Sequence, residues 1–222
     1  MTDFIEDSEI PKAMPMEDVP DTADLPDFTD EEIAEEYGSY VDDTSIRAYE
    51  LGLERCRDIA TETFTSEVLG EWYDMSKDER VDLINTYGHR IADVMGIDFR
   101  GLVFDVTETG VLGYNSGDGY VHLAEYLVKE PGQIVELIDT VSHELRHQFQ
   151  YEAYHDPEKF GIDEQTAREW RLAWEVYYTQ DPVSNYDPIG YKYNPLETDA
   201  RNCGEAMAQA VVRGWYKDIS VA

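Results

Sequence analysis

No part of this sequence restricts the possible folds more than the stretch from Pro131 to Tyr154, because its two sides carry different chemistry. Apolar residues recur along it at the spacing of one helix face, namely Ile134, Ile138, Val141, Leu145 and Phe149. At about 100° per residue, His143 and His147 fall on the opposite side. The sequence therefore predicts a long helix that packs one face into a core and carries a histidine pair on the other.

His143 and His147 belong to the segment Val141-Ser142-His143-Glu144-Leu145-Arg146-His147, which contains the pattern H-E-x-x-H. Side chains four residues apart project from one side of a helix, so both imidazoles reach a single cation. The Glu144 carboxylate reaches water on such a cation without ligating the metal. Zn²⁺ suits this arrangement, because it lowers the pKa of bound water to about 7 and polarises a carbonyl. The alternative is a surface helix that exposes two histidines among charged residues.

A catalytic zinc ion usually takes three protein ligands and leaves a fourth position for water. The extended pattern H-E-x-x-H-x-x-G-x-x-H requires a glycine at position 150 and a histidine at position 153. Those positions hold Gln150 and Ala153, and His155 is out of register by two residues. A glutamate on a later helix, as in a His₂Glu site, is therefore the better expectation.

Glu197 is the best candidate for this third ligand, with Asp199 as the second candidate. Glu197 flanks the stripe of the last predicted helix that we expect to be buried, made of Leu196, Ala200, Cys203, Met207 and Val211. A structural interpretation competes with this one. Asn194, Pro195 and Glu197 also fit the Ncap, N1 and N3 positions of a variant capping box, which needs no metal.

The two segments together resemble the zincin-like metallopeptidases of the gluzincin kind. More closely, they resemble small bacterial and phage-associated members that pair H-E-x-x-H with a later P-x-E-x-D-A segment, here Pro195 to Ala200. The E-x-[DE]-A piece is similar to that of the ImmA/IrrE regulators, which are implied to cleave a repressor. The resemblance covers about residues 100 to 215. It implies a compact zincin fold, in which the edge strand of a small sheet binds the substrate and the motif helix lies behind it.

By motif position, the resemblance implies one catalytic Zn²⁺ held by His143, His147 and Glu197, with Glu144 as the general base. The thermolysin pattern E-x-x-x-D would place an aspartate at position 201, which is Arg201 in this chain. The partner that orients a ligand histidine is therefore left open, with Asp199 as a candidate.

The rest of the chain indicates an α+β domain, with a small, mostly antiparallel sheet packed on helices that include the motif helix. A capping box of Ser76 and Glu79 begins one helix, which Gly96 ends. Other helices are expected to begin at Asp43, at about Asp163 and at Asn194, and strands to lie at residues 102–106, 110–114 and 120–123. The turn signal at residues 115–119 joins the last two strands into a hairpin.

Residues 1–36 are predicted to form an acidic, disordered tail, because they combine four prolines with many carboxylates and almost no basic residue. Residues 37–222 form the expected zincin-like metallopeptidase domain, helical over residues 43–96, with the sheet and the active-site helices over residues 100–216. A docking or inhibitory function of the tail has no support in the sequence.

The formal net charge of -32 restricts the partners of the chain. Such a surface repels phosphates and anionic lipids, so we expect no direct binding to nucleic acid or membrane, and basic peptides or proteins are favoured as substrates. Two isolated cysteines, Cys56 and Cys203, indicate a reducing compartment. With no signal-peptide start and no apolar run of about 18 residues, the protein is expected to be cytoplasmic. The sequence leaves its oligomeric state open.

The main functional hypothesis is a zinc-dependent peptidase, a hydrolase of peptide bonds. Two alternatives remain: an acidic binding protein that mimics DNA or inhibits a basic partner, and a zincin fold without activity. Tyr186, Tyr191 and Tyr193 are candidates for stabilising an oxyanion, although loop tyrosines more often simply pack on the surface. His122 lies in an expected edge strand, where it either contacts a substrate backbone or is an ordinary strand histidine.

Overall fold

The computed structural model of the chain describes residues 43–107, 110–115, 117–179 and 194–219. The predicted tail (1–36) and the tyrosine-bearing loop (181–193) lie outside these residues, so the predictions made for them stay predictions. The described part is mostly helical with a three-stranded sheet, which confirms the α+β class. None of the described helices combines the length and the apolar character needed to cross a membrane.

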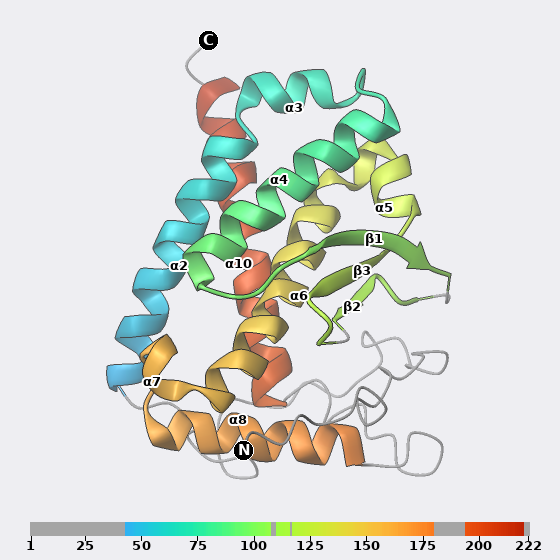
Figure 1. Ribbon diagram of the computed structural model, residues 1–222. Coiled ribbons are helices and arrows are strands. Elements are labelled where there is room, and N and C mark those ends of the chain that lie inside the picture. The colour runs from blue at the N-terminus through green and yellow to red at the C-terminus, as the bar shows by residue number, and fades with distance from the viewer. Residues whose placement is uncertain (1–42, 108–109, 116, 180–193, 220–222) are drawn as a thin grey trace, which may run out of the picture.

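Helix α6 runs through the middle of the molecule beside α10, while α3 lies across the top and α8 across the base (Figure 1). In chain order the described elements are α2 (Asp43–Thr63), α3 (Ser66–Trp72), α4 (Lys77–Met95), β1 (Gly101–Val106), β2 (Gly113–Asn115), β3 (Tyr120–Ala124), α5 (Tyr126–Lys129), the 3-10 turn η2 (Pro131–Gln133), α6 (Ile134–His155), α7 (Pro157–Phe160), α8 (Glu164–Thr179) and α10 (Pro195–Ile219). The predicted long helices are confirmed. Helix α3 was not predicted, because seven residues show too little periodicity to stand out.

The helix ends follow the sequence signals. Ser76 accepts a hydrogen bond from the Glu79 amide, and Glu79 accepts one from the Ser76 amide, which completes the predicted capping box of α4. Gly96 ends the same helix in the left-handed conformation, with φ of 71°, where a side chain would be strained.

The sheet has the strand order β1-β3-β2. β2 and β3 pair antiparallel, as the turn signal between them predicts, but β1 pairs with β3 in parallel. The sheet is therefore mixed, and the expectation of a mostly antiparallel sheet is wrong for one of its two pairings. The hairpin turn constrains only how β2 and β3 pair with each other, and it leaves open which of them lies beside β1. β3 is consequently the central strand, so the prediction that it lies at an edge is also wrong.

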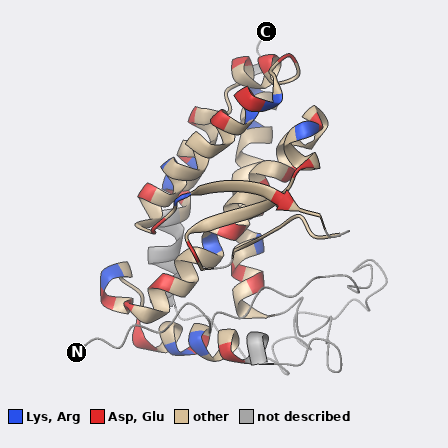
Figure 2. Cartoon of the chain, turned by 45° about the vertical axis from the view of Figure 1, so that its right-hand side comes forward, with Lys and Arg blue, Asp and Glu red and all other residues tan. Residues whose placement is uncertain are grey.

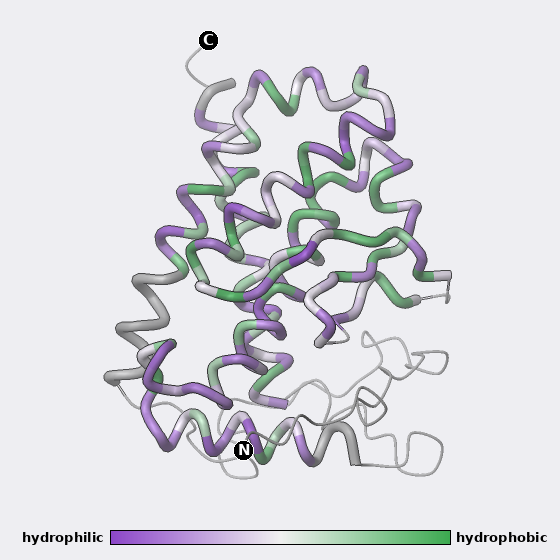
Figure 3. The backbone as a smooth tube through the Cα atoms, in the orientation of Figure 1, coloured by the Kyte–Doolittle hydropathy of each residue, from purple (hydrophilic) through white to green (hydrophobic). Residues whose placement is uncertain are grey.

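The core lies between the sheet and α6 and extends to α2, α4 and α10. Figure 3 shows hydrophobic residues concentrated on the strands and on the helix segments that face the interior. The predicted apolar side of α6 is buried there, because Ile138, Val141 and Leu145 are all 0% exposed and pack with residues of β3. Each such side chain contributes about 1.5–3 kcal/mol through burial. Phe149 instead packs in a second cluster with Trp170 and Leu196.

Helices α6 and α10 run antiparallel and approach closely at Gly204. A Cβ atom at Gly204 would lie 2.1 Å from Asp139 Oδ1 and 2.7 Å from the Asp139 carbonyl oxygen, so only glycine permits this spacing. The predicted buried stripe of α10, which runs through Ala200, is confirmed by its burial. The close approach brings the first turn of α10 against the middle of α6, where the histidine pair lies.

Candidate metal centre

Three predicted ligands converge from two helices. His143 and His147 project from α6, and Glu197 projects from the first turn of α10. His143 Nε2 lies 3.0 Å from His147 Nε2, while the two Glu197 oxygens lie 3.5 Å from His143 Nε2 and 3.4 Å from His147 Nε2. Among the described residues, these three form the one group of histidine, cysteine and carboxylate side chains with ligand atoms close enough to share a metal ion.

The donor set and its spacing fit a tetrahedral zinc ion. With metal–ligand distances of 2.0–2.1 Å, two ligand atoms of a tetrahedron lie about 3.3 Å apart. The two histidine nitrogens lie 3.0 Å apart, and each lies near that value, at 3.5 or 3.4 Å, from a different oxygen of the Glu197 carboxylate. Glu197 Oε2 is buried and accepts no hydrogen bond within the described part of the chain. A buried carboxylate oxygen without a donor is costly unless a cation faces it.

The capping interpretation of Glu197 explains less than the ligand interpretation. Asn194 caps α10 by itself, since its Oδ1 accepts a hydrogen bond from the Leu196 amide at 2.9 Å. Glu197 is only 4% exposed, and its oxygens face the two histidines. The histidines are also largely covered, which disagrees with the alternative of a surface helix that exposes both rings.

Electrostatics in the cluster favour a positive charge. Burial lowers the pKa of His147, but the nearby Glu197 carboxylate outweighs it and raises that pKa to about 9. Burial raises the pKa of Glu197, but His147 and His143 outweigh it and hold the pKa well below its ordinary value. The two shifts together favour a proton in the cluster, which a metal dication would have to displace.

Glu144 is almost fully buried beside the cluster. Burial raises the pKa of its carboxyl group, and the two histidines partly oppose this effect. A carboxylate with a raised pKa is a stronger base, which suits proton transfer near neutral pH. The Glu144 backbone carbonyl accepts a hydrogen bond from Asn115 Nδ2 at 3.3 Å, which connects the motif helix to β2.

Asp199, the second candidate ligand, does not belong to the ligand group. Its carboxylate accepts hydrogen bonds from Arg146 Nε at 2.7 Å, Arg146 Nη2 at 3.2 Å and Gln150 Nε2 at 2.6 Å. Gln150 Oε1 lies 2.9 Å from His147 Nδ1, so Asp199 reaches the histidine only through this amide. The sequence interpretation missed Gln150, although its position one turn after His147 was the available signal.

Two further predictions concern residues near the site. His122 Nδ1 lies 2.9 Å from Asp105 Oδ1, and its ring stacks on Tyr114 with ring centres 4.5 Å apart, so its described contacts lie within the sheet region. Trp170 is buried, as expected for a core residue. The ring of Trp174 lies 6.4 Å from that of His147 and provides an aromatic flank to the metal centre.

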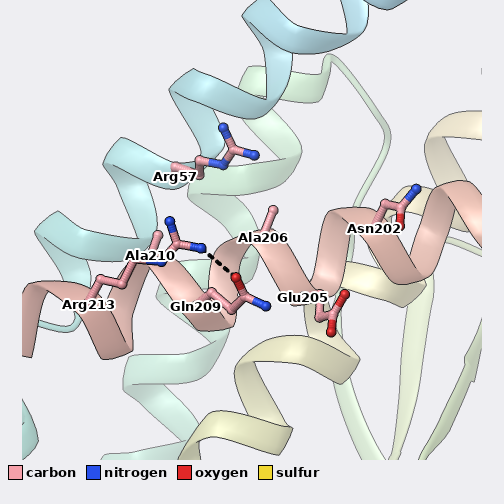
Figure 4. A pocket seen from close by; sticks show the side chains of 7 residues that line it. All are labelled: Arg57, Asn202, Glu205, Ala206, Gln209, Ala210 and Arg213. Carbon is pink, nitrogen blue, oxygen red and sulfur yellow. Dashed lines mark hydrogen bonds between the residues drawn. The ribbon is translucent and has the colours of Figure 1, made fainter.

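A separate groove of about 340 Å³ lies between α2 and α10 (Figure 4). Its lining residues are Arg57, Asn202, Glu205, Ala206, Gln209, Ala210 and Arg213. None of them is a predicted site residue. The groove therefore adds nothing to the metal centre.

Comparison of the chain with protein-family models, with curated proteins and with solved structures finds no match. The geometry of the cluster and the sequence motifs are therefore the grounds for a functional proposal.

Proposed function

We propose that the protein is a zinc-dependent peptidase with a zincin-type fold, whose zinc ligands are His143, His147 and Glu197. The observation that supports this proposal is the convergence of these side chains from α6 and α10, with ligand atoms of the three residues within 4.8 Å of one another. The resemblance of the two motifs to gluzincins supports the same function.

The residues divide the chemistry between them. When bound, zinc supplies a Lewis acid that polarises the scissile carbonyl and makes water a better nucleophile. Glu144 accepts the proton of the attacking water on its carboxylate, and the water oxygen bonds to the carbonyl carbon. Glu144 then donates that proton to the amine nitrogen as the carbon–nitrogen bond breaks. The burial of Glu144 makes it a stronger base for the first of these transfers.

β2 is the strand that suits a substrate backbone. The Ala124 amide donates to the Leu112 carbonyl, and alternation along an antiparallel pair then directs the Tyr114 backbone groups toward β3. The backbone groups of Gly113 and Asn115 point the other way, toward the outer edge. Asn115 also holds this edge against Glu144. An extended peptide added there would run past the general base.

The charge of the chain supports basic peptides as substrates. Figure 2 shows acidic residues spread along the helices, with basic residues scattered among them. The net charge of -32 raises the local concentration of cationic peptides around the protein. Because this charge belongs to the whole chain, it affects how fast a basic peptide reaches the protein. It does not determine which peptide bond is cleaved.

Metal analysis and a peptidase assay on matched variants test the proposal. Wild type is expected to hold about one zinc ion per chain, which His147→Ala and Glu197→Ala lose and His122→Ala keeps. Glu144→Gln is expected to keep zinc and to lose hydrolysis of a basic peptide library by a factor of about 10²–10⁴. A protein without stoichiometric zinc, or Glu144→Gln with wild-type activity, contradicts the proposal. If the protein holds zinc and binds basic partners without cleaving them, it is an acidic binding protein or a zincin fold without activity.

A further inference from the structure

Gln150 lies one turn beyond His147 on α6 and is completely buried between α6 and α10. Its amide nitrogen donates one hydrogen bond to the Leu196 carbonyl at 2.9 Å and another to Asp199 Oδ2 at 2.6 Å. Its amide oxygen lies 2.9 Å from His147 Nδ1. One neutral side chain therefore contacts a ligand histidine and two points of the helix that carries Glu197.

The two acceptors on α10 decide the orientation of the amide. Both protons of the Gln150 nitrogen are engaged by Leu196 and Asp199, so the atom that faces His147 is the oxygen, which only accepts. His147 must then carry a proton on Nδ1. The lone pair of the neutral ring consequently lies on Nε2, the atom 3.4 Å from Glu197 Oε1.

The same contacts fix the first turn of α10 against α6. Leu196 directly precedes Glu197, so the hydrogen bond to the Leu196 carbonyl holds the backbone from which the ligand carboxylate projects. Asp199 cannot turn away, because Arg146 grips its carboxylate at both oxygens, at 2.7 and 3.2 Å. The amide thus braces the two helices at the point where their ligands meet.

We propose that Gln150 is the positioning residue of the metal centre. It selects the Nδ1–H tautomer of His147 and holds Glu197 at ligating distance. The inference rests on the proposed zinc site and adds a residue that neither motif contains. A neutral amide accepts the Nδ1–H hydrogen bond without drawing the proton away, so His147 stays a neutral ligand and more of the ion's Lewis acidity remains for the substrate.

Zinc affinity is the first measurement. Gln150→Met removes both functions of the amide at similar volume, and competition with a chromophoric chelator is expected to show zinc binding weakened about 10–100-fold. Gln148→Met is the matched control. Gln148 is also a buried glutamine of α6, and its amide donates to Glu152 on the same helix at 2.8 Å. This control is expected to keep the wild-type affinity.

The tautomer of His147 is the second measurement, and loss of packing alone would not change it. Imidazole ¹⁵N NMR of the metal-free protein, at a pH where the ring is neutral, is expected to show Nδ1–H in wild type and a mixture of tautomers in Gln150→Met. His147→Ala assigns the signal. A wild-type ring protonated on Nε2, or an unchanged pattern in Gln150→Met, overturns the inference.

If Gln150→Met does not fold, Gln150→Asn serves in its place, since a side chain shorter by one methylene cannot span both helices.

The outcomes distinguish this inference from the proposed function. Unchanged zinc affinity in Gln150→Met overturns the inference and leaves the peptidase intact. A zinc protein that hydrolyses no peptide overturns the peptidase, while the affinity comparison still decides for or against Gln150. A wild type that binds no zinc overturns both.

Discussion

Arg80 and Arg146 are both buried arginines, but their hydrogen-bond networks end on different groups. Arg146 donates to Asp199, whose carboxylate also accepts from Gln150, and Gln150 contacts the ligand candidate His147. The acceptors of Arg80 are the backbone carbonyls of Trp72, Tyr73, Val128 and Lys129. One network therefore closes on the backbone and joins α3 to α5, whereas the other continues into the metal centre.

A buried arginine is therefore not in itself a sign of function. Both guanidinium groups satisfy the same requirement, since a buried charge needs several hydrogen-bond partners. The two arginines differ in the groups on which their hydrogen-bond networks end. The hydrogen bonds of Arg80 end on backbone carbonyls near helix ends, whereas those of Arg146 lead through Asp199 and Gln150 to His147, a candidate metal ligand.

The largest expected effect concerns the closed network. Arg80→Met leaves four carbonyl oxygens without their donor, so we expect the free energy of unfolding to fall by about 3 kcal/mol in urea titrations. Zinc affinity should not change in the protein that remains folded. Arg90→Met is the control on the same helix, because its partners are the half-exposed Glu62 carboxylate and the Thr63 hydroxyl, and their loss should cost only about 1 kcal/mol. A large loss of zinc affinity in Arg80→Met would erase the distinction between the two networks.

A smaller effect is expected where α10 meets α6. Gly204→Ala places a methyl group against Asp139, so α10 must shift, and we expect about 2 kcal/mol of destabilisation together with weaker zinc binding. Gly214→Ala is the matched control in the same helix, where the added methyl group lies 4.0 Å from Thr61 Cγ2. The control should gain up to about 1 kcal/mol from helix propensity. Equal behaviour of the two variants would show that the close approach does not position Glu197.

The zinc affinity of the candidate site is expected to depend on pH. Because the Glu197 carboxylate holds the pKa of His147 at about 9, zinc binding near neutral pH releases the proton of His147. Zinc affinity should therefore fall about tenfold for each pH unit below 9 and level off above it. Calorimetry in buffers of different ionisation enthalpy measures the released proton. An affinity that stays constant between pH 6 and pH 8 would show that His147 carries no proton in the metal-free protein.

The stability contributions of His147 and Glu197 depend on pH in opposite directions. The folded-state pKa of His147 lies above its unfolded value, so its contribution to stability is present at neutral pH and is lost as pH rises through about 9. The folded-state pKa of Glu197 lies below its unfolded value, so its contribution is present at neutral pH and is lost in acid.

The sequence predicted local features well, because they depend on neighbours in the chain. The capping box of Ser76 and Glu79, the left-handed Gly96 and the hairpin between β2 and β3 follow from residue types at fixed offsets. The errors concern longer range. The parallel pairing of β1 and the central position of β3 depend on which strands meet in the folded sheet, which no local pattern encodes.

The candidate site divides in the same way. Residue spacing alone predicts that His143 and His147 share a side of one helix, because helical geometry is regular. The position of Glu197 opposite them, and the contact of Gln150 instead of Asp199 with His147, come from the packing of α10 on α6. Those relations depend on how closely α10 approaches α6, which is set by contacts between residues about fifty or more positions apart, such as Gly204 against Asp139.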